Sequence, residues 1–304
     1  MVDTFTTETD ADTTAIVREA DGFELLPEAE VERIFKKYDI DEVYNLAAQS
    51  FVATSFKSPL NTSNVTGLGV LRILETIKSI NRKIKFYQAS SSEMFGKIFD
   101  KKQSEKTQLN PQSPYAISKV FGHYMTDNYR KSYGMYAVSG ILFNHESPLR
   151  GEEFVTRKII LGLVKIINND LKCLELGNIY AKRDWGYAKE YVSAMWKMLQ
   201  KKKPKDYVIS TGKTYSIKYF INLATKYLNL ETKWVGRGLN EKLINLNNNK
   251  TIIKINPKLF RPAEVNILKG NSNLAKKELN WHPKTNLKML VKIMVDQEIK
   301  FYKK

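Results

Sequence analysis

The chain of 304 residues is poor in the residue types that form disulfides and zinc sites. It has one cysteine, Cys173, and three histidines without metal-ligand spacing. A single cysteine excludes a disulfide within the chain and is typical of a reducing compartment. Long apolar runs are also missing and the N-terminus is acidic, so neither a membrane span nor a secretory signal is expected. We therefore expect a cytoplasmic protein with no metal site.

Glycine is scarce in the first part of the chain. Gly22 is the only glycine before Gly67, and neither G-x-G-x-x-G nor G-x-x-G-x-x-G occurs anywhere. Rossmann-type domains place such a turn between their first strand and helix, where its backbone N–H groups bind the pyrophosphate of a dinucleotide. The sequence therefore predicts that this phosphate-binding element is absent.

The net charge of +17 is distributed unevenly. Residues 1–30 carry a net charge of −8 and the remaining residues +25. Met1–Thr14 has no apolar period and is predicted to be disordered, so residues 1–30 form a separate acidic segment without family likeness. The lysines of the remainder are scattered, and no zinc finger or RNA-binding motif accompanies them. We expect no nucleic-acid partner, and the charge would suit a small anionic substrate.

Beyond residue 30, strand and helix patterns alternate, which favours a mostly parallel sheet covered by helices on both faces. Runs typical of strands are Glu42–Ala47, Ile84–Ala89, Tyr136–Phe143, Leu174–Leu176, Tyr207–Ser210 and Thr251–Ile255. Runs typical of helices are Val31–Tyr38, Asn64–Ile80, Pro114–Tyr133, Thr156–Asn168, Trp185–Leu199, Ile217–Leu228, Leu274–Leu279 and Leu287–Tyr302. The alternation loosens near Glu152. We therefore predict a partial dinucleotide-binding domain over 31–150 and a mainly substrate-binding lobe over 151–304, with some elements returning to the core.

A tyrosine and a lysine four residues apart stand out after the second strand. Tyr115 and Lys119 form the only Tyr-x-x-x-Lys pair in the chain and follow the run Ser90-Ser91-Ser92-Glu93. On a helix the two side chains point the same way. An adjacent ammonium favours the phenolate and lowers a tyrosine pKa that is normally ~10. Together with a hydroxyl and a carboxylate, the pair predicts acid–base chemistry of the kind used in sugar oxidation.

Several motifs in order resemble the extended short-chain dehydrogenase/reductase family, and within it the GDP-mannose 4,6-dehydratases. The likeness extends from about Val31 to the end of the chain. It is carried by Asn45-Leu46-Ala47-Ala48-Gln49-Ser50, Gln88-Ala89-Ser90-Ser91-Ser92-Glu93, Tyr115–Lys119, Phe143-Asn144-His145-Glu146-Ser147-Pro148, Arg183-Asp184-Trp185-Gly186 and Phe260-Arg261-Pro262-Ala263-Glu264-Val265.

The resemblance implies NADP-dependent dehydration of GDP-mannose to GDP-4-keto-6-deoxymannose. Tyr115, assisted by Lys119 and hydrogen-bonded to Ser91, would remove the O4 proton while the C4 hydride passes to NADP⁺. Glu93 would then take the C5 proton, the 6-hydroxyl would leave as water, and the hydride would return to C6. A carboxylate suits this task because elimination needs a base and then an acid at one place. The family commonly has threonine where Ser91 stands, a mild change between two hydroxyls.

The same resemblance implies the binding residues and the assembly. Cofactor contacts would come from Leu46, Ala47, Ala48, Gln49, Ser50, Tyr115, Lys119, His145 and Arg150. The nucleotide sugar would be held by Asn144, Lys158, Arg183, Arg261 and Glu264, with the cations facing the diphosphate. The family implies a homo-oligomer, either a dimer or a tetramer.

Set against the family fold, the chain predicts an incomplete Rossmann-type parallel sheet that lacks its first βαβ unit, with a smaller C-terminal α/β substrate lobe. The Glu42–Ala47 strand would then lie at a sheet edge. Two alternatives to an active lyase stay open: a truncated, catalytically impaired remnant that binds nucleotide sugar or a full-length partner, and a nucleotide-sugar epimerase or reductase.

Plainer interpretations exist for individual residues. His145 is interpretable as a structural hydrogen-bonding residue, and Arg183 as a surface ion-pair partner of Asp184. Arg261 has the same simple interpretation with Glu264. Trp185 and Trp196 are expected in the core.

Overall fold

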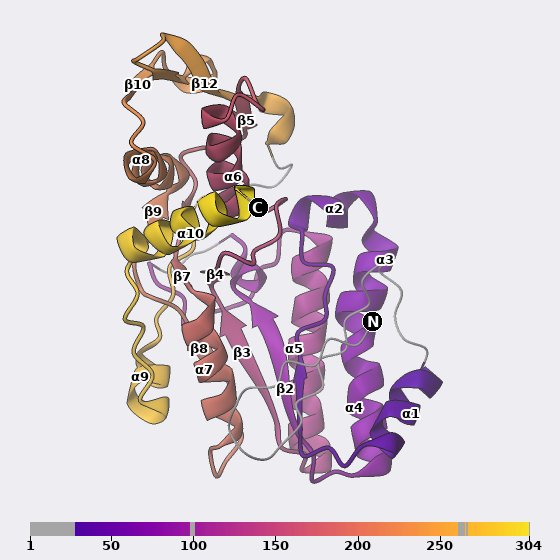
Figure 1. The fold of residues 1–304 in the computed structure, drawn as a ribbon. Coiled ribbons are helices and arrows are strands. Elements are labelled where there is room, and N and C mark those ends of the chain that lie inside the picture. Colours follow the sequence, from indigo (N-terminus) through magenta and orange to yellow (C-terminus); the bar gives the residue numbers. More distant parts are fainter. Residues whose placement is uncertain (1–27, 98–100, 261–264, 266, 304) are drawn as a thin grey trace. The chain divides into compact units, whose positions relative to one another are not determined.

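The computed structural model describes residues 28–97, 101–260, 265 and 267–303 (Figure 1). The predicted disorder of Met1–Thr14 lies outside the described residues, as do Arg261 and Glu264. The chain divides into two compact units. The first runs to Leu142 and also includes Val192–Ile209 and Asn271–Trp281; the second takes Phe143–Tyr191, Ser210–Gly270 and the chain from His282.

The first unit is built on a four-stranded parallel sheet. Its strands are β1 (Glu42–Asn45), β2 (Lys85–Ser91), β3 (Ala137–Leu142) and β8 (Tyr207–Ile209), in the spatial order β1-β2-β3-β8. β3 is buried along its whole length, as expected for a parallel strand covered on both faces. Within the described residues, β1 forms one edge of this sheet, as predicted for the Glu42–Ala47 strand.

Helices join and cover these strands. In chain order they are α1 (Glu28–Lys37), α2 (Val52–Lys57), α3 (Pro59–Ser63), a π-helical turn (Asn64–Leu68), α4 (Gly69–Ile80), α5 (Pro114–Tyr133), α7 (Ala188–Leu199), which continues in from the second unit, and α9 (Asn273–Leu279). α5 packs on β2 and β3, and α4 packs between α5 and α1 (Figure 1). The core beneath them joins Val70, Leu74 and Ile77 of α4 to Phe86 of β2.

α5 carries clear start and stop signals in its sequence. The Ser113 hydroxyl accepts a hydrogen bond from the Ala116 N–H, and Pro114 occupies the first turn. Gly134 ends the helix in the left-handed conformation, with φ +66°. These signals fix Tyr115 in the first turn and Lys119 one turn later.

Over its described residues, the second unit combines a mixed sheet and two two-stranded sheets with helices. Its strands are β4 (Asn144–Glu146), β5 (Leu174–Leu176), β6 (Lys182–Arg183), β7 (Trp185–Tyr187), β9 (Tyr215–Ser216), β10 (Thr232–Val235), β11 (Lys242–Asn245) and β12 (Lys250–Ile255). The order β10-β11-β12-β5 makes one sheet, whereas β4 pairs with β7 and β6 with β9. The helices α6 (Val155–Ile167), α8 (Ile217–Tyr227) and α10 (Leu287–Tyr302) share one apolar core with β5 and β12.

Several short elements were not predicted, and two predictions were wrong. Residues 185–187, expected at the start of a helix, form β7 instead, because Trp185 pairs with Asn144 of β4. Trp185 is buried as expected, but Trp196 is 56% exposed on α7, so its assignment to the core was wrong. None of the described helices is long and apolar enough to cross a membrane.

Candidate active site at the carboxyl ends of β1 and β2

The carboxyl ends of two neighbouring strands bring the candidate catalytic residues to one edge of the first sheet. β1 and β2 are parallel and pair from Glu42 with Lys85 to Asn45 with Gln88. Their carboxyl ends therefore lie at the same end of the sheet. Ser91 is the last residue of β2, and the loop Leu46–Ser50 follows β1 directly. Ligands of open α/β sheets bind at such edges.

Ser91 and Glu93 lie where the strand turns into a short 3-10 helix, Ser92–Phe95. The Ser91 hydroxyl accepts a hydrogen bond from the Glu93 N–H at 3.2 Å and so caps this helix. Gly96 ends the helix with φ +52°, and a Cβ there would lie 1.8 Å from the Asn110 carbonyl oxygen. The turn that carries Glu93 therefore requires glycine at this position.

Tyr115 and Lys119 reach the end of β2 from α5. The Lys119 Nζ donates to the Ala89 carbonyl oxygen at 2.8 Å and lies 5.9 Å from the centre of the Tyr115 ring. Both side chains are buried, with 8% of Tyr115 and 3% of Lys119 exposed. Burial lowers the pKa of Lys119 to about 8, because the protein interior solvates an ammonium less well than water. The structure thus holds the Lys119 ammonium beside the phenol of Tyr115, and the pKa of this lysine lies close to neutral pH.

A histidine that sequence reasoning missed lies one turn further along α5. His123 Nδ1 lies 3.3 Å from the Ser90 hydroxyl, and burial lowers the pKa of this histidine. The imidazole is therefore neutral at neutral pH and serves as a hydrogen-bonding partner of the β2 end. Helical spacing from Tyr115 and Lys119 was the available signal for it.

In the loop after β1, some residues are buried in the fold and others are exposed. Gln49 is 2% exposed; its backbone N–H donates to the Thr66 hydroxyl and its amide group bonds Phe51 and Thr62. The Gln49 side chain is thus used within the fold. The exposed residues of the loop are Leu46, Ala47 and Ser50.

The other predicted site residues that the structure describes belong to the second unit. Asn144 and His145 lie on β4, and the His145 ring stacks on Tyr191 with its Nδ1 2.9 Å from the Phe143 carbonyl oxygen. Arg150 pairs with the buried Glu146 at 3.3 Å. Lys158 lies half-buried on α6.

Arg183 is only 7% exposed, so its interpretation as a surface ion-pair residue was wrong. Its guanidinium donates to the Lys182 carbonyl oxygen at 3.0 Å. The Asp184 carboxylate accepts from the backbone N–H groups of Thr211 and Gly212 and from the Thr211 hydroxyl. Asp184 is therefore a structural anchor of the second unit.

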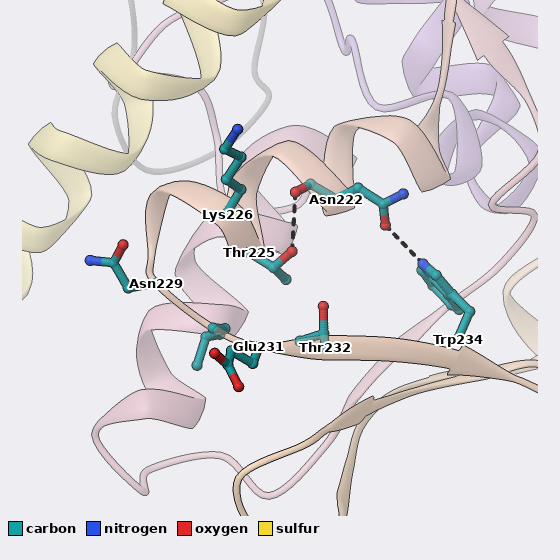
Figure 2. A pocket seen from close by; sticks show the side chains of 8 residues that line it. Asn222, Thr225, Lys226, Asn229, Glu231, Thr232 and Trp234 are labelled. Atoms are coloured by element: carbon teal, nitrogen blue, oxygen red, sulfur yellow. Dashed lines mark hydrogen bonds between the residues drawn. The ribbon is translucent and has the colours of Figure 1, made fainter.

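A hollow of about 540 Å³ lies between α8 and β10 in the second unit (Figure 2). Its lining includes Asn222 and Trp234, whose indole N–H donates to the Asn222 amide oxygen at 2.8 Å. It contains none of the predicted site residues. Among the described residues, no group of three or more His, Cys, Asp or Glu side chains is arranged to hold a metal ion.

Comparison with known proteins decides the family. The sequence profile of the family described as GDP-mannose 4,6 dehydratase matches residues 19–294. This chain belongs to that family. The match includes residues 19–30, which the sequence analysis had assigned to the unrelated acidic segment.

Curated relatives agree over most of the chain. A GDP-mannose 4,6-dehydratase of Vibrio cholerae is 46% identical over 288 residues, covering 91% of this chain and 77% of that protein. GDP-mannose 4,6 dehydratase 1 of Arabidopsis thaliana is 48% identical and covers 87% of this chain and 69% of its own length. Identity at this level across bacteria and plants supports the motif-based resemblance.

Solved structures support the fold. RMD from Pseudomonas aeruginosa, complexed with NADPH, superposes with a TM-score of 0.77 at 20% identity, covering 90% of this chain and 86% of that one. A UDP-glucose 4-epimerase of Thermotoga maritima gives a TM-score of 0.76 at 21% identity, with 90% and 82% coverage. The α/β fold with a parallel sheet is therefore confirmed.

Proposed function

We propose that this protein converts GDP-mannose to GDP-4-keto-6-deoxymannose with NADP as its cofactor. The observation that carries the proposal is the Tyr115–Lys119 pair at the carboxyl end of β2, in a chain of this family. Ser91 and Glu93 lie at the same end of β2. The name shared by its curated relatives supplies the substrate.

Each residue has a task that its surroundings support. Tyr115 acts as the base for the O4 proton, since the Lys119 ammonium beside its ring favours the phenolate. Ser91 supplies a hydroxyl at the end of β2. Glu93 takes the C5 proton and gives it to the leaving 6-hydroxyl, which departs as water. After the hydride has returned to C6, C5 takes a proton that comes from solvent.

The edge formed by β1 and β2 fits the nicotinamide end of the cofactor. The exposed Leu46, Ala47 and Ser50 face outward from the same edge that carries Tyr115 and Lys119. Bound there, the nicotinamide would accept a hydride and give it back. Of the second-unit residues, His145 and Arg150 are assigned to the cofactor. No residue is assigned to the pyrophosphate, because the sequence contains no glycine-rich turn.

The residues proposed for GDP-mannose are Asn144, Lys158, Arg183, Arg261 and Glu264, of which Arg261 and Glu264 lie outside the described residues. A cytoplasmic location also belongs to the proposal, because a single cysteine suits a reducing compartment.

We also propose that the chain forms a homo-oligomer through α5. Ile117, Phe121 and Tyr124 follow one another at helical spacing and are 57%, 38% and 56% exposed. Leu68 of the adjoining π-helical turn is 43% exposed. An apolar helix face of this kind is commonly covered in a symmetric pair by the same face of a second copy.

The experiment that tests the main proposal is incubation of the purified chain with NADP⁺ and GDP-mannose, with UDP-glucose and dTDP-glucose in parallel. We expect loss of one water from GDP-mannose only, detected by mass spectrometry. Loss of water from dTDP-glucose instead, or conversion of UDP-glucose to its epimer seen by NMR, would favour another dehydratase or an epimerase and overturn the substrate assignment.

The missing glycine-rich turn favours a second candidate function, binding of GDP-mannose without turnover. Titration calorimetry separates the two. Binding of GDP-mannose with no detectable binding of NADP⁺ would support this second function, whereas binding of both ligands supports the lyase.

A further inference from the structure

One backbone carbonyl of β2, that of Ala89, lies just beyond the part of β2 that pairs with β1. The Lys85 N–H donates toward β1, to the Asp41 carbonyl, while the Phe86 N–H donates toward β3, to the Tyr136 carbonyl. Backbone groups of alternate residues in a strand point to opposite sides, so those of Ala89 point toward β1. Because β1 ends at Asn45, opposite Gln88, the Ala89 carbonyl follows the last paired position.

Two buried side chains donate to this carbonyl in place of a strand. The Gln88 Nε2 lies 3.1 Å from the Ala89 oxygen and the Lys119 Nζ lies 2.8 Å from it. Gln88 is held in turn by Asn45, whose Nδ2 donates to the Gln88 Oε1 at 2.8 Å. Gln88, Asn45 and Lys119 are 0%, 5% and 3% exposed, so water does not compete for these bonds.

The hydrogen-bond chain connects the loop after β1 to the ammonium beside Tyr115. The Asn45 Oδ1 accepts from the Ala47 N–H at 3.2 Å, which begins the chain at Leu46–Ser50. A carbonyl oxygen has two acceptor positions. The Gln88 amide occupies one of them, and the Lys119 ammonium is left with the other.

We propose that Gln88, held in place by Asn45, is a positioning residue that fixes the Lys119 ammonium toward Tyr115 by sharing the Ala89 carbonyl. This inference deepens the proposed function and rests on it, because that function gives Lys119 its task. Without the Gln88 amide, both acceptor positions of the carbonyl would be open to the ammonium, which would no longer be held on the side of Tyr115.

The charge distribution around Lys119 predicts the direction in which its pKa changes when Gln88 is replaced. The N–H₂ end of the Gln88 amide carries partial positive charge near the ammonium and disfavours the protonated lysine. Replacing Gln88 with an apolar residue of similar size should therefore raise the Lys119 pKa. The neighbouring titratable groups, Tyr115 and His123 on α5, stay unchanged in every variant.

The experiment follows the titration of Lys119 by NMR in protein labelled with ¹³C at the lysine Cε, without substrate or cofactor. The Lys119 signal is assigned by its loss in Lys119→Met. We expect Gln88→Met to raise the midpoint by at least about half a unit, and Asn45→Ala to raise it less. The double variant should match Gln88→Met alone, because both changes act through one chain of bonds.

Ser139→Ala is the matched control. Ser139 pairs with Gln88 across the β2–β3 ladder and is equally buried, and its hydroxyl has no hydrogen-bond partner among the described residues. Its replacement should leave the Lys119 midpoint unchanged. A shift as large as that of Gln88→Met would show a general packing effect and overturn the inference.

Other outcomes are equally decisive. An unchanged midpoint in a folded Gln88→Met protein, or additive shifts of Gln88→Met and Asn45→Ala, would overturn the inference. If Gln88→Met does not fold, an unchanged midpoint in Asn45→Ala overturns it and a raised one supports it. In active protein, the alkaline limb of kcat against pH should move up with the midpoint. Failure of the proposed function is recognised separately, by the absence of ketosugar from the unaltered chain.

Discussion

At the scale of single residues, the site depends on a lysine that the fold holds at some cost. Lys119 is almost fully buried, with one hydrogen bond to a backbone carbonyl, and burial lowers its pKa from 10.5 to about 8. Between these two values the unfolded chain binds a proton that the folded chain does not. Stability from this residue therefore rises as the pH increases from 8 to 10.5 and is lowest below pH 8.

Lys119→Met should stabilise the folded protein, although it removes a residue of the proposed site. At pH 7 we expect the variant to be more stable than the parent by roughly 1 to 3 kcal/mol, because the penalty for a buried ammonium disappears. The gain should shrink toward pH 10, where the parent's lysine is neutral when folded. Urea unfolding at both pH values measures this; a variant that is less stable at pH 7 would contradict the account.

At the same scale, sequence reasoning found the residues whose spacing is local. The i, i+4 relation predicted that Tyr115 and Lys119 lie together, and the structure places Nζ 5.9 Å from the ring centre. Gln88 and Asn45 stand within two of the motifs, and the sequence gives neither of them a role of its own. Their hydrogen bond joins residues 43 positions apart, and it depends on where β1 ends, which the sequence does not specify.

At the scale of elements, the strand–turn–helix from β2 through Ser92–Phe95 determines where Glu93 lies. Gly96 closes this turn with a positive φ and close to the Asn110 carbonyl. Gly134, at the end of α5, also has a positive φ, +66°, but a Cβ there would meet nothing within 4 Å. Alanine at Gly134 would therefore meet backbone strain alone, whereas alanine at Gly96 would meet backbone strain and a steric clash.

Gly96→Ala should destabilise the protein by more than Gly134→Ala and should also reduce turnover. Gly134, with φ +66° and ψ 19°, is in the left-handed α conformation, which costs alanine about 1–2 kcal/mol. Gly96, with φ +52° and ψ −120°, is in a region that an L-residue tolerates less well still. Only Gly96→Ala adds a clash that displaces the turn of Glu93. Thermal unfolding and initial rates measure both effects; equal losses of stability and unchanged rates in the two variants would show that the turn does not position Glu93.

Elements with strong local signals were predicted best. Pro114–Tyr133 and Leu287–Tyr302 are helices with the bounds that their sequence predicts, because Ser113 and Asn286 cap their first turns. The two-residue strands β6 and β9 were not predicted, since they exist through pairing with each other rather than through their own sequence. Trp185–Tyr187 was predicted as helix because its own sequence carries no strand signal. It forms a strand by pairing with β4, which lies about forty residues earlier in the chain.

At the scale of the whole molecule, α5 has two faces with different tasks. One face buries Tyr115 and Lys119 against the sheet of the first unit, and the other exposes Ile117, Phe121 and Tyr124. If a second copy covers the exposed face, assembly also stabilises the helix that carries the catalytic pair. Oligomerisation and activity should then be linked.

Phe121→Glu should shift the protein toward monomers, because it places a charge in the apolar face of α5. Trp196→Glu is the control, since Trp196 is an exposed aromatic residue on another helix, α7, with 56% of its surface exposed against 38% for Phe121. Sedimentation velocity measures the masses. A monomeric parent protein, or dissociation caused by Trp196→Glu and not by Phe121→Glu, would show that α5 is not the interface.

The most direct test of the account is proton NMR of the reaction in D₂O with GDP-mannose and NADP⁺. We expect the parent chain to form the 4-ketosugar with deuterium at C5, since the proton that C5 takes after the hydride returns to C6 comes from solvent. Tyr115→Phe should lower the rate by about 10²–10⁴-fold with the fold intact, and Glu93→Gln should abolish loss of water. Tyr115→Phe that keeps most of its rate, or Glu93→Gln that still yields the deuterated ketosugar, would contradict it.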